Sequence, residues 1–147
     1  MPELKRILLA EDSANDVELT LAALAEFRVV NDIDVVRDGA EALDYLFRRG
    51  SHAARDAGTP AVVLLDLKMP KVDGLEVLRQ IKEHPKLRTI PVVMLTSSRE
   101  EADLIRSYQL GVNGYVVKPV EFGDFMSAVR QVGAFWAVVN EAPPTGL

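Results

Sequence analysis

The sequence contains no cysteine, which excludes disulfide bonds, thiolate nucleophiles and metal sites built on cysteine ligands. It also lacks the run of about eighteen apolar residues that a membrane-spanning helix requires. Its first apolar run, at residues 7–10, is too short for a secretory signal peptide. These absences predict a cytoplasmic protein that has no membrane partner.

Positive charge is in short supply relative to negative charge. The chain has 17 Lys and Arg residues against 22 Asp and Glu residues, for a net charge of −5. Proteins that bind nucleic acids cluster Lys and Arg on one face, so we expect no nucleic-acid partner here. The 147 residues, 48% of them hydrophobic, are enough for one domain with a substantial core.

Five short apolar runs alternate with segments of helical period. The runs are Ile7–Ala10, Ile33–Val36, Val62–Leu65, Val92–Leu95 and Tyr115–Val117. Four are typical of buried parallel strands, whereas the second is interrupted by Asp34 and predicts an edge strand. Apolar residues between the runs recur every three or four positions, the last such segment covering residues 122–136. This alternation predicts an α/β fold with a parallel sheet between two layers of helices. The polar residues 48–60 predict a surface insertion.

Polar side chains follow four of the five predicted strands. Glu11 and Asp12 follow the first, Asp66 the third, Thr96 the fourth and Lys118 the fifth. Ligands bind at the carboxyl ends of parallel strands, so we expect these side chains to converge. Clustered carboxylates need a cation, and Mg²⁺ prefers oxygen ligands. An ammonium and a hydroxyl beside them suit phosphoryl transfer, in which an aspartate can accept the group.

Each of these residues also has an ordinary structural explanation. Asp12 could cap the next helix, and Asp66 could begin a turn. Thr96 could simply finish its strand, and Lys118 could be a solvated lysine at a sheet edge. Their joint position at four strand ends favours a site over four separate explanations.

Other polar residues are assigned structural roles or none. Ser13, followed three residues later by Asp16, makes a better helix cap than Asp12. Residues 37–39, Arg-Asp-Gly, are typical of an ordinary turn. His52 and His84 look isolated in a loop and at a helix end, and neither is assigned a function.

Four motifs resemble those of response-regulator receiver domains, the phosphoacceptor half of two-component signalling. They are ILLAED, VVLLDLKMPKVDG, VVMLTSS and GYVVKP, and the resemblance extends from residue 5 to about residue 133. It implies a flavodoxin-like (βα)5 fold, doubly wound, with strand order 2-1-3-4-5. We accordingly take residues 1–133 as the receiver domain.

The resemblance also assigns the acidic residues. Asp66 would be the aspartate phosphorylated by a histidine kinase. Asp12 would bind Mg²⁺ directly and Glu11 through a water molecule. The backbone carbonyl of Lys68 would complete the protein ligands. The family more often has aspartate at the position of Glu11, and this difference would affect the details of metal coordination but not the presence of the site.

The remaining family positions imply a switch. Lys118 would pair with the phosphoryl group and Thr96 would hydrogen-bond to it, with Tyr115 turning inward in response. No enzymatic activity is implied beyond self-catalysed phosphotransfer and hydrolysis of the aspartyl phosphate. An unrelated phosphatase with an aspartyl nucleophile would need a second acid where Lys68 stands. A receiver-like binding module that takes no phosphate is the alternative left open.

The C-terminal residues indicate which subtype of response regulator the chain resembles. Residues 134–147 form the C-terminal extension of the last predicted helix and the tail, and we expect them to be a dimerisation element. We therefore expect a single-domain regulator whose output is a partner or its own dimer. The apolar side chains of this extension would surround the helix instead of forming one stripe along it. They are Phe135, Trp136, Val138 and Val139. They either fold back on the domain or form a subunit interface. The ending resembles that of small homodimeric regulators paired with phytochrome-type histidine kinases.

Overall fold

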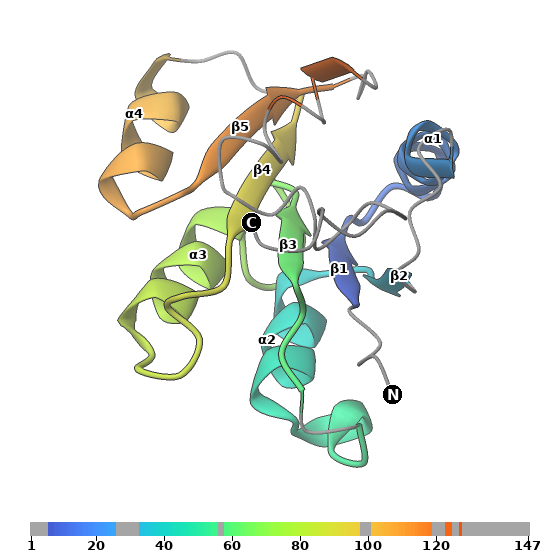
Figure 1. The fold of residues 1–147 in the computed structure, drawn as a ribbon, viewed down its shortest axis with the longest axis vertical. Coiled ribbons are helices and arrows are strands. Elements are labelled where there is room, and N and C mark those ends of the chain that lie inside the picture. The colour runs from blue at the N-terminus through green and yellow to red at the C-terminus, as the bar shows by residue number, and fades with distance from the viewer. Residues whose placement is uncertain are drawn as a thin grey trace, which may run out of the picture.

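The computed structural model describes residues 6–25, 33–55, 58–97 and 101–118, together with positions 123, 124 and 127. Within these residues, five parallel strands form one sheet in the order β2-β1-β3-β4-β5 (Figure 1). The strands are β1 (Ile7–Ala10), β2 (Ile33–Val36), β3 (Val62–Leu65), β4 (Val92–Thr96) and β5 (Gly114–Val117). All five predicted strands are therefore confirmed, and β2 lies at an edge as expected.

Helices cover both faces of this sheet. They are α1 (Ala14–Ala25), α2 (Gly39–Phe47), α3 (Gly74–Glu83) and α4 (Glu101–Gln109), with a 3-10 turn, η1 (Gly50–His52), after α2. Figure 1 shows α2, α3 and α4 on one side of the strands and α1 on the other. None of the helices in the described ranges is long and apolar enough to cross a membrane. Residues 123, 124 and 127 of the predicted helix at 122–136 are helical, whereas the rest of that segment and the predicted boundary at residue 133 lie outside the described residues.

The core explains why the strands are continuously apolar. Alternate strand residues, such as Leu8, Val63 and Met94, join α2 and α3 in one buried cluster. The residues between them, such as Leu9 and Leu64, are equally buried. Successive side chains of a strand point to opposite faces, so both faces of the central strands are covered.

Side-chain caps begin three of the helices. The Oγ of Ser13 accepts a hydrogen bond from the backbone N–H of Asp16 at 3.3 Å, which confirms the predicted cap of α1. Asp38 caps α2 by accepting from the N–H of Glu41 at 2.7 Å, and Asp73 caps α3 in the same way. The prediction of an ordinary turn at residues 37–39 was therefore incomplete, because Asp38 starts a helix.

The loop after β3 packs tightly against the start of α2. A Cβ at Gly39 would lie 1.7 Å from the backbone oxygen of Val72, so no larger residue fits there. Lys71 adopts a left-handed backbone conformation with φ of 68°, and its Nζ lies 3.5 Å from an oxygen of Asp38. A Cβ at Gly74 would lie 2.1 Å from the backbone oxygen of Asp66. Two glycines thus allow the close contacts that place this loop.

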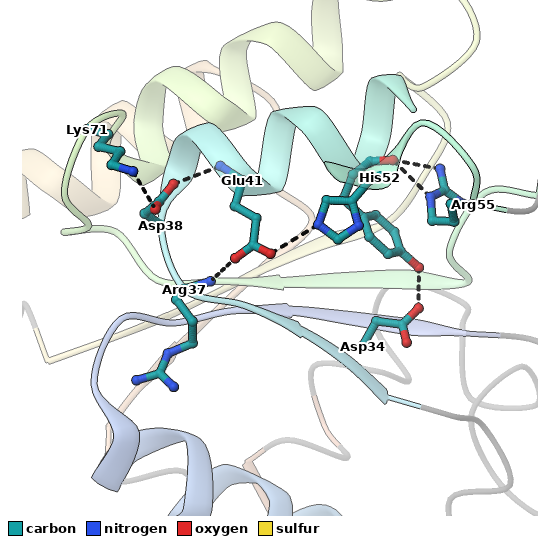
Figure 2. Close-up of polar contacts among 8 residues, drawn as sticks. Asp34, Arg37, Asp38, Glu41, His52, Arg55 and Lys71 are labelled. Atoms are coloured by element: carbon teal, nitrogen blue, oxygen red, sulfur yellow. Dashed lines mark hydrogen bonds and ion pairs between the residues drawn. The ribbon is translucent and has the colours of Figure 1, made fainter. Parts of the chain in front are cut away.

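The polar segment after α2 is anchored to the domain. Arg55 donates two hydrogen bonds to the backbone oxygen of Tyr45, at 3.0 and 2.7 Å, and its guanidinium lies over the Tyr45 ring at 4.1 Å. The Tyr45 hydroxyl donates to Asp34 on β2 at 2.5 Å. Burial and this hydrogen bond raise the pKa of Tyr45 to about 12. Figure 2 shows how these contacts hold the segment against β2 and α2, so it is more than a surface insertion.

Candidate functional site

Three carboxylates meet at the carboxyl ends of the neighbouring strands β1 and β3. One oxygen from each of Glu11, Asp12 and Asp66 lies within 4.8 Å of the other two. The register explains this, because Ala10 of β1 pairs with Leu65 of β3, so the next residue of each strand reaches the same edge. The N–H of Asp66 donates to the oxygen of Ala10 at 3.0 Å and extends the ladder. The predicted acidic cluster is therefore formed by the fold itself.

Burial makes this cluster electrostatically unfavourable. The exposed fraction is 2% for Glu11 and 6% for Asp66, whereas Asp12 is exposed. Burial, followed by the charge of Glu11, raises the pKa of Asp66 to about 7, although Lys118 opposes the change. Burial thus disfavours the ionised form of Asp66, and a nearby cation offsets this effect.

Lys118 supplies such a cation. Its Nζ contacts Glu11, lies 3.0 Å from an oxygen of Asp16 and lies 3.6 Å from an oxygen of Asp66. Burial by itself would lower the pKa of Lys118, but its hydrogen bonds to Glu11 and Asp16 and the nearby charges outweigh burial and raise it. The ammonium is thus held charged beside the expected phosphoacceptor.

Asp16 is a site neighbour that sequence reasoning assigned only to a helix start. It lies in the first turn of α1 and reaches Lys118 from there. A signal was available, because Asp16 lies only four residues after Asp12, in the first turn of the helix that directly follows the end of β1. That spacing could have suggested a fourth acid near the cluster.

Two of the other predicted site residues, Thr96 and Lys68, lie at the same edge, whereas Tyr115 lies within β5. Thr96 ends β4 and pairs with Val117, directly before Lys118, although its side chain lies outside what the structure describes. Tyr115 on β5 is half-buried and packs against the core cluster. Lys68 is exposed in the loop two residues after Asp66. Their proposed roles in metal binding and switching stay predictions.

Arg37 also reaches the site, and sequence reasoning missed it. Its Nη2 donates a hydrogen bond to the backbone oxygen of Asp12 at 3.1 Å. Arg37 directly follows β2, whose last residue, Val36, pairs with Ala10 of β1. The strand order thus brings it to the same edge, and knowledge of that order is the signal that could have found it.

The donor set fits a hard divalent cation. Three carboxylates face one close ammonium, and burial, followed by the charge of Glu11, raises the pKa of Asp66. Mg²⁺ takes oxygen ligands, commonly one or two carboxylates with water and phosphate oxygens. The exposed Asp12 leaves one side of the cluster open to solvent. The arrangement can therefore hold a metal ion next to a nucleophilic carboxylate.

Comparisons with known proteins agree with this geometry. Residues 7–130 match the family model of the response regulator receiver domain. The solved structure of the bacteriophytochrome response regulator AtBRR is 62% identical, with a TM-score of 0.87 over 95% of this chain and 100% of that chain. Response regulator Rcp1 of Synechocystis sp. is 40% identical over 132 residues, covering 90% of this chain and 88% of that protein.

Two further structures relate to the site. The Mn²⁺-bound form of Rcp1 has a TM-score of 0.75, 39% identity and coverage of 95% of this chain and 99% of that chain. The phosphorylated cyanobacterial phytochrome response regulator RcpA has a TM-score of 0.76 and 41% identity, covering 92% of this chain and 95% of that chain. The flavodoxin-like receiver fold is thus common to this chain and these neighbours.

Proposed function

This chain belongs to the response regulator receiver domain family, and we propose on that basis that Asp66 accepts a phosphoryl group from a histidine kinase with the help of Mg²⁺. The supporting observation is the position of Asp66, which is buried among two other carboxylates with the Lys118 ammonium 3.6 Å away. The relatives add support, since one was solved with Mn²⁺ and another in a phosphorylated form.

The transfer forms one bond and breaks one. An oxygen of Asp66 bonds to phosphorus while the P–N bond of the donor's phosphohistidine breaks, and the electron pair of that bond stays on the imidazole nitrogen. Lys118 and Thr96 would then contact phosphoryl oxygens. Mg²⁺, when bound by Asp12, Asp66, the Lys68 carbonyl and, through water, Glu11, supplies neutralising positive charge. Lys118 is already held beside Asp66, so its ammonium needs little movement.

The signalling context follows from the relatives. This chain is related to phytochrome response regulators, so we propose a bacteriophytochrome-type histidine kinase as the phosphodonor. Phosphorylation would draw Thr96 toward the phosphoryl group and let Tyr115 turn inward. The only reactions expected of the protein are self-catalysed phosphotransfer and hydrolysis of its own aspartyl phosphate. A cytoplasmic location, like the absence of nucleic-acid and membrane partners, stays a prediction.

Mass spectrometry after treatment with acetyl phosphate tests the proposal. In the presence of Mg²⁺ one phosphoryl group should add about 80 Da to the intact protein, and a chelator should prevent the addition. Peptide mapping should place the group on the peptide that contains Asp66. A label on any other peptide would contradict the assignment, and a folded protein that takes no label would instead be a receiver-like binding module.

We further propose that the chain forms a homodimer through its C-terminal apolar residues. The support is the sequence pattern alone, in which Phe135, Trp136, Val138 and Val139 exceed what one buried helix face needs. Sedimentation should show a dimer that Trp136→Ala weakens by roughly tenfold or more, as expected for an interface aromatic. Leu19→Ala, on the exposed face of α1, is the matched control. An unchanged mass for Trp136→Ala would show that the tail only packs locally.

A further inference from the structure

Arg37 connects the acidic site to the segment that follows α2. We propose that it is a positioning residue for the metal site: its guanidinium holds the backbone of Asp12, and Glu41 and His52 hold Arg37 in place. This inference rests on the proposed Mg²⁺ site and adds a support that neither the family assignment nor the acidic residues include. This chain of contacts links Asp12, Arg37, Glu41 and His52, so it joins residues that lie up to 40 positions apart in the sequence.

The contact with Asp12 is the inner end of this chain. Arg37 Nη2 donates to the carbonyl oxygen of Asp12 at 3.1 Å, and in Figure 2 the Arg37 side chain points away from α2 toward the segment between β1 and α1. Asp12 is the exposed member of the acidic cluster. Its carboxylate therefore depends on the backbone for its position more than the buried Glu11 and Asp66 do.

Glu41 is the middle of the chain. One of its oxygens accepts a hydrogen bond from the backbone N–H of Arg37 at 2.9 Å, and the other lies 3.0 Å from His52 Nε2. Figure 2 shows Glu41 between these two partners. Its own N–H donates to the cap Asp38. Both carboxylate oxygens are thus engaged, which fixes the direction in which Arg37 leaves β2.

His52 is the outer end. Its ring meets the Tyr45 ring edge to face, with centroids 5.3 Å apart, and Tyr45 is buried. The same tyrosine is held by Arg55 and Asp34. His52 is therefore not isolated, as the sequence suggested, but fixed by a buried aromatic residue. Residues 50–55 thereby hold Glu41 through His52, and Glu41 in turn holds the backbone of Arg37.

Positioning and simple electrostatics predict opposite effects of removing Arg37. The guanidinium is a positive charge near a cation site, so its loss should strengthen Mg²⁺ binding if charge alone acts. The guanidinium is exposed, and solvent and salt weaken that repulsion. Loss of the hydrogen bond to Asp12 would let a metal ligand move and should weaken binding. The sign of the change in Mg²⁺ affinity therefore distinguishes the charge effect from the positioning effect.

Calorimetric titration of the full chain with Mg²⁺ is the test. We expect Arg37→Ala to weaken Mg²⁺ binding roughly tenfold, the lower end of the range for residues that orient metal ligands. Arg37→Lys keeps the charge and an N–H donor, and should recover most of the affinity. Glu41→Ala should weaken binding by a smaller factor, about threefold on the same grounds. Arg49→Ala removes an arginine that pairs with Asp44 instead, and should bind like the wild type.

The outcomes separate this inference from the proposed function. A wild-type protein that binds no Mg²⁺ overturns the proposed metal site itself. A wild type that binds Mg²⁺, with an Arg37→Ala variant that binds equally or more tightly, overturns the positioning role alone. Thermal melting in chelator establishes that Arg37→Ala is folded. If it is not, Arg37→Met, which keeps part of the apolar stem but removes the charge and the N–H donors, replaces Arg37→Ala in the comparison with Arg49→Ala, and the sign of the change in Mg²⁺ affinity is read in the same way.

Discussion

Replacing Asp66 with asparagine should abolish phosphorylation and, at pH 8, make the metal-free protein more stable. The first effect follows because an amide oxygen cannot form a stable acyl phosphate in this reaction. The second follows because Asp66 is buried beside Glu11, and burial together with that charge raises its pKa from 3.8 to about 7. An ionised Asp66 therefore opposes folding when no metal is present.

The direction of the pH dependence follows from this raised pKa. The folded state binds the Asp66 proton more tightly than the unfolded state does, so this group stabilises the fold below about pH 4 and loses that contribution as the pH rises to about 7. Each tenfold change in proton affinity corresponds to about 1.4 kcal/mol. Readjustment of Glu11 and Lys118 reduces the gain, and we expect Asp66→Asn to stabilise by on the order of 2 kcal/mol at pH 8.

Chemical denaturation at pH 5 and pH 8 in chelator measures this effect. The gain from Asp66→Asn should be larger at pH 8 than at pH 5, and Mg²⁺ should stabilise the wild type more than the variant. Asp12→Asn is the matched control, since Asp12 is exposed and its replacement should change the metal-free stability by less than about 0.5 kcal/mol. A destabilised Asp66→Asn protein at pH 8 would refute the electrostatic account.

Replacing Lys118 with methionine should have the opposite effect on stability. Lys118 contacts Glu11 and Asp16 and lies near Asp66, with only 10% of its side chain exposed. Methionine keeps much of the stem but leaves buried carboxylates without their cation, which typically costs about 3 kcal/mol or more. The loss should shrink at pH 5, where Asp66 is protonated. Phosphorylation by acetyl phosphate should slow roughly a hundredfold.

Lys71→Met provides the control for Lys118→Met. Lys71 lies in the loop after Asp66, but its side chain is 70% exposed and its ion pair with Asp38 spans 3.5 Å. Exposed ion pairs contribute at most about 1 kcal/mol, so this variant should lose little stability and keep its phosphorylation rate. Equal losses for the two lysines would show that Lys118 acts only through general charge and not through its place in the site.

The sequence predicted the parts of this protein that depend on local patterns. The central strands are apolar at every position because helices cover both faces of the sheet, and such runs are visible without a structure. The end of each run also marks the position of a candidate site residue, because the residue that follows each run is polar. Asp66 and Lys118 could therefore be placed at one edge from topology rules alone.

The supports of the site could not be predicted in the same way. Arg37 contacts a backbone carbonyl 25 positions away, and Glu41, near the start of α2, contacts His52 in η1 beyond the end of that helix. These hydrogen bonds depend on side-chain directions and on the path of residues 48–55, for which neither helical nor strand periodicity gives information. Asp16 was assigned to a helix start, and that assignment concealed its second contact, with Lys118.

The close approach of Val72 to Gly39 has a consequence for engineering. The backbone oxygen of Val72 occupies the space that a side chain at position 39 would need. The loop at residues 67–73 and the first residue of α2 therefore form one unit for grafting. A chimera that receives this loop from another receiver domain must also receive a residue at position 39 that matches it, although the two lie about thirty positions apart in the chain.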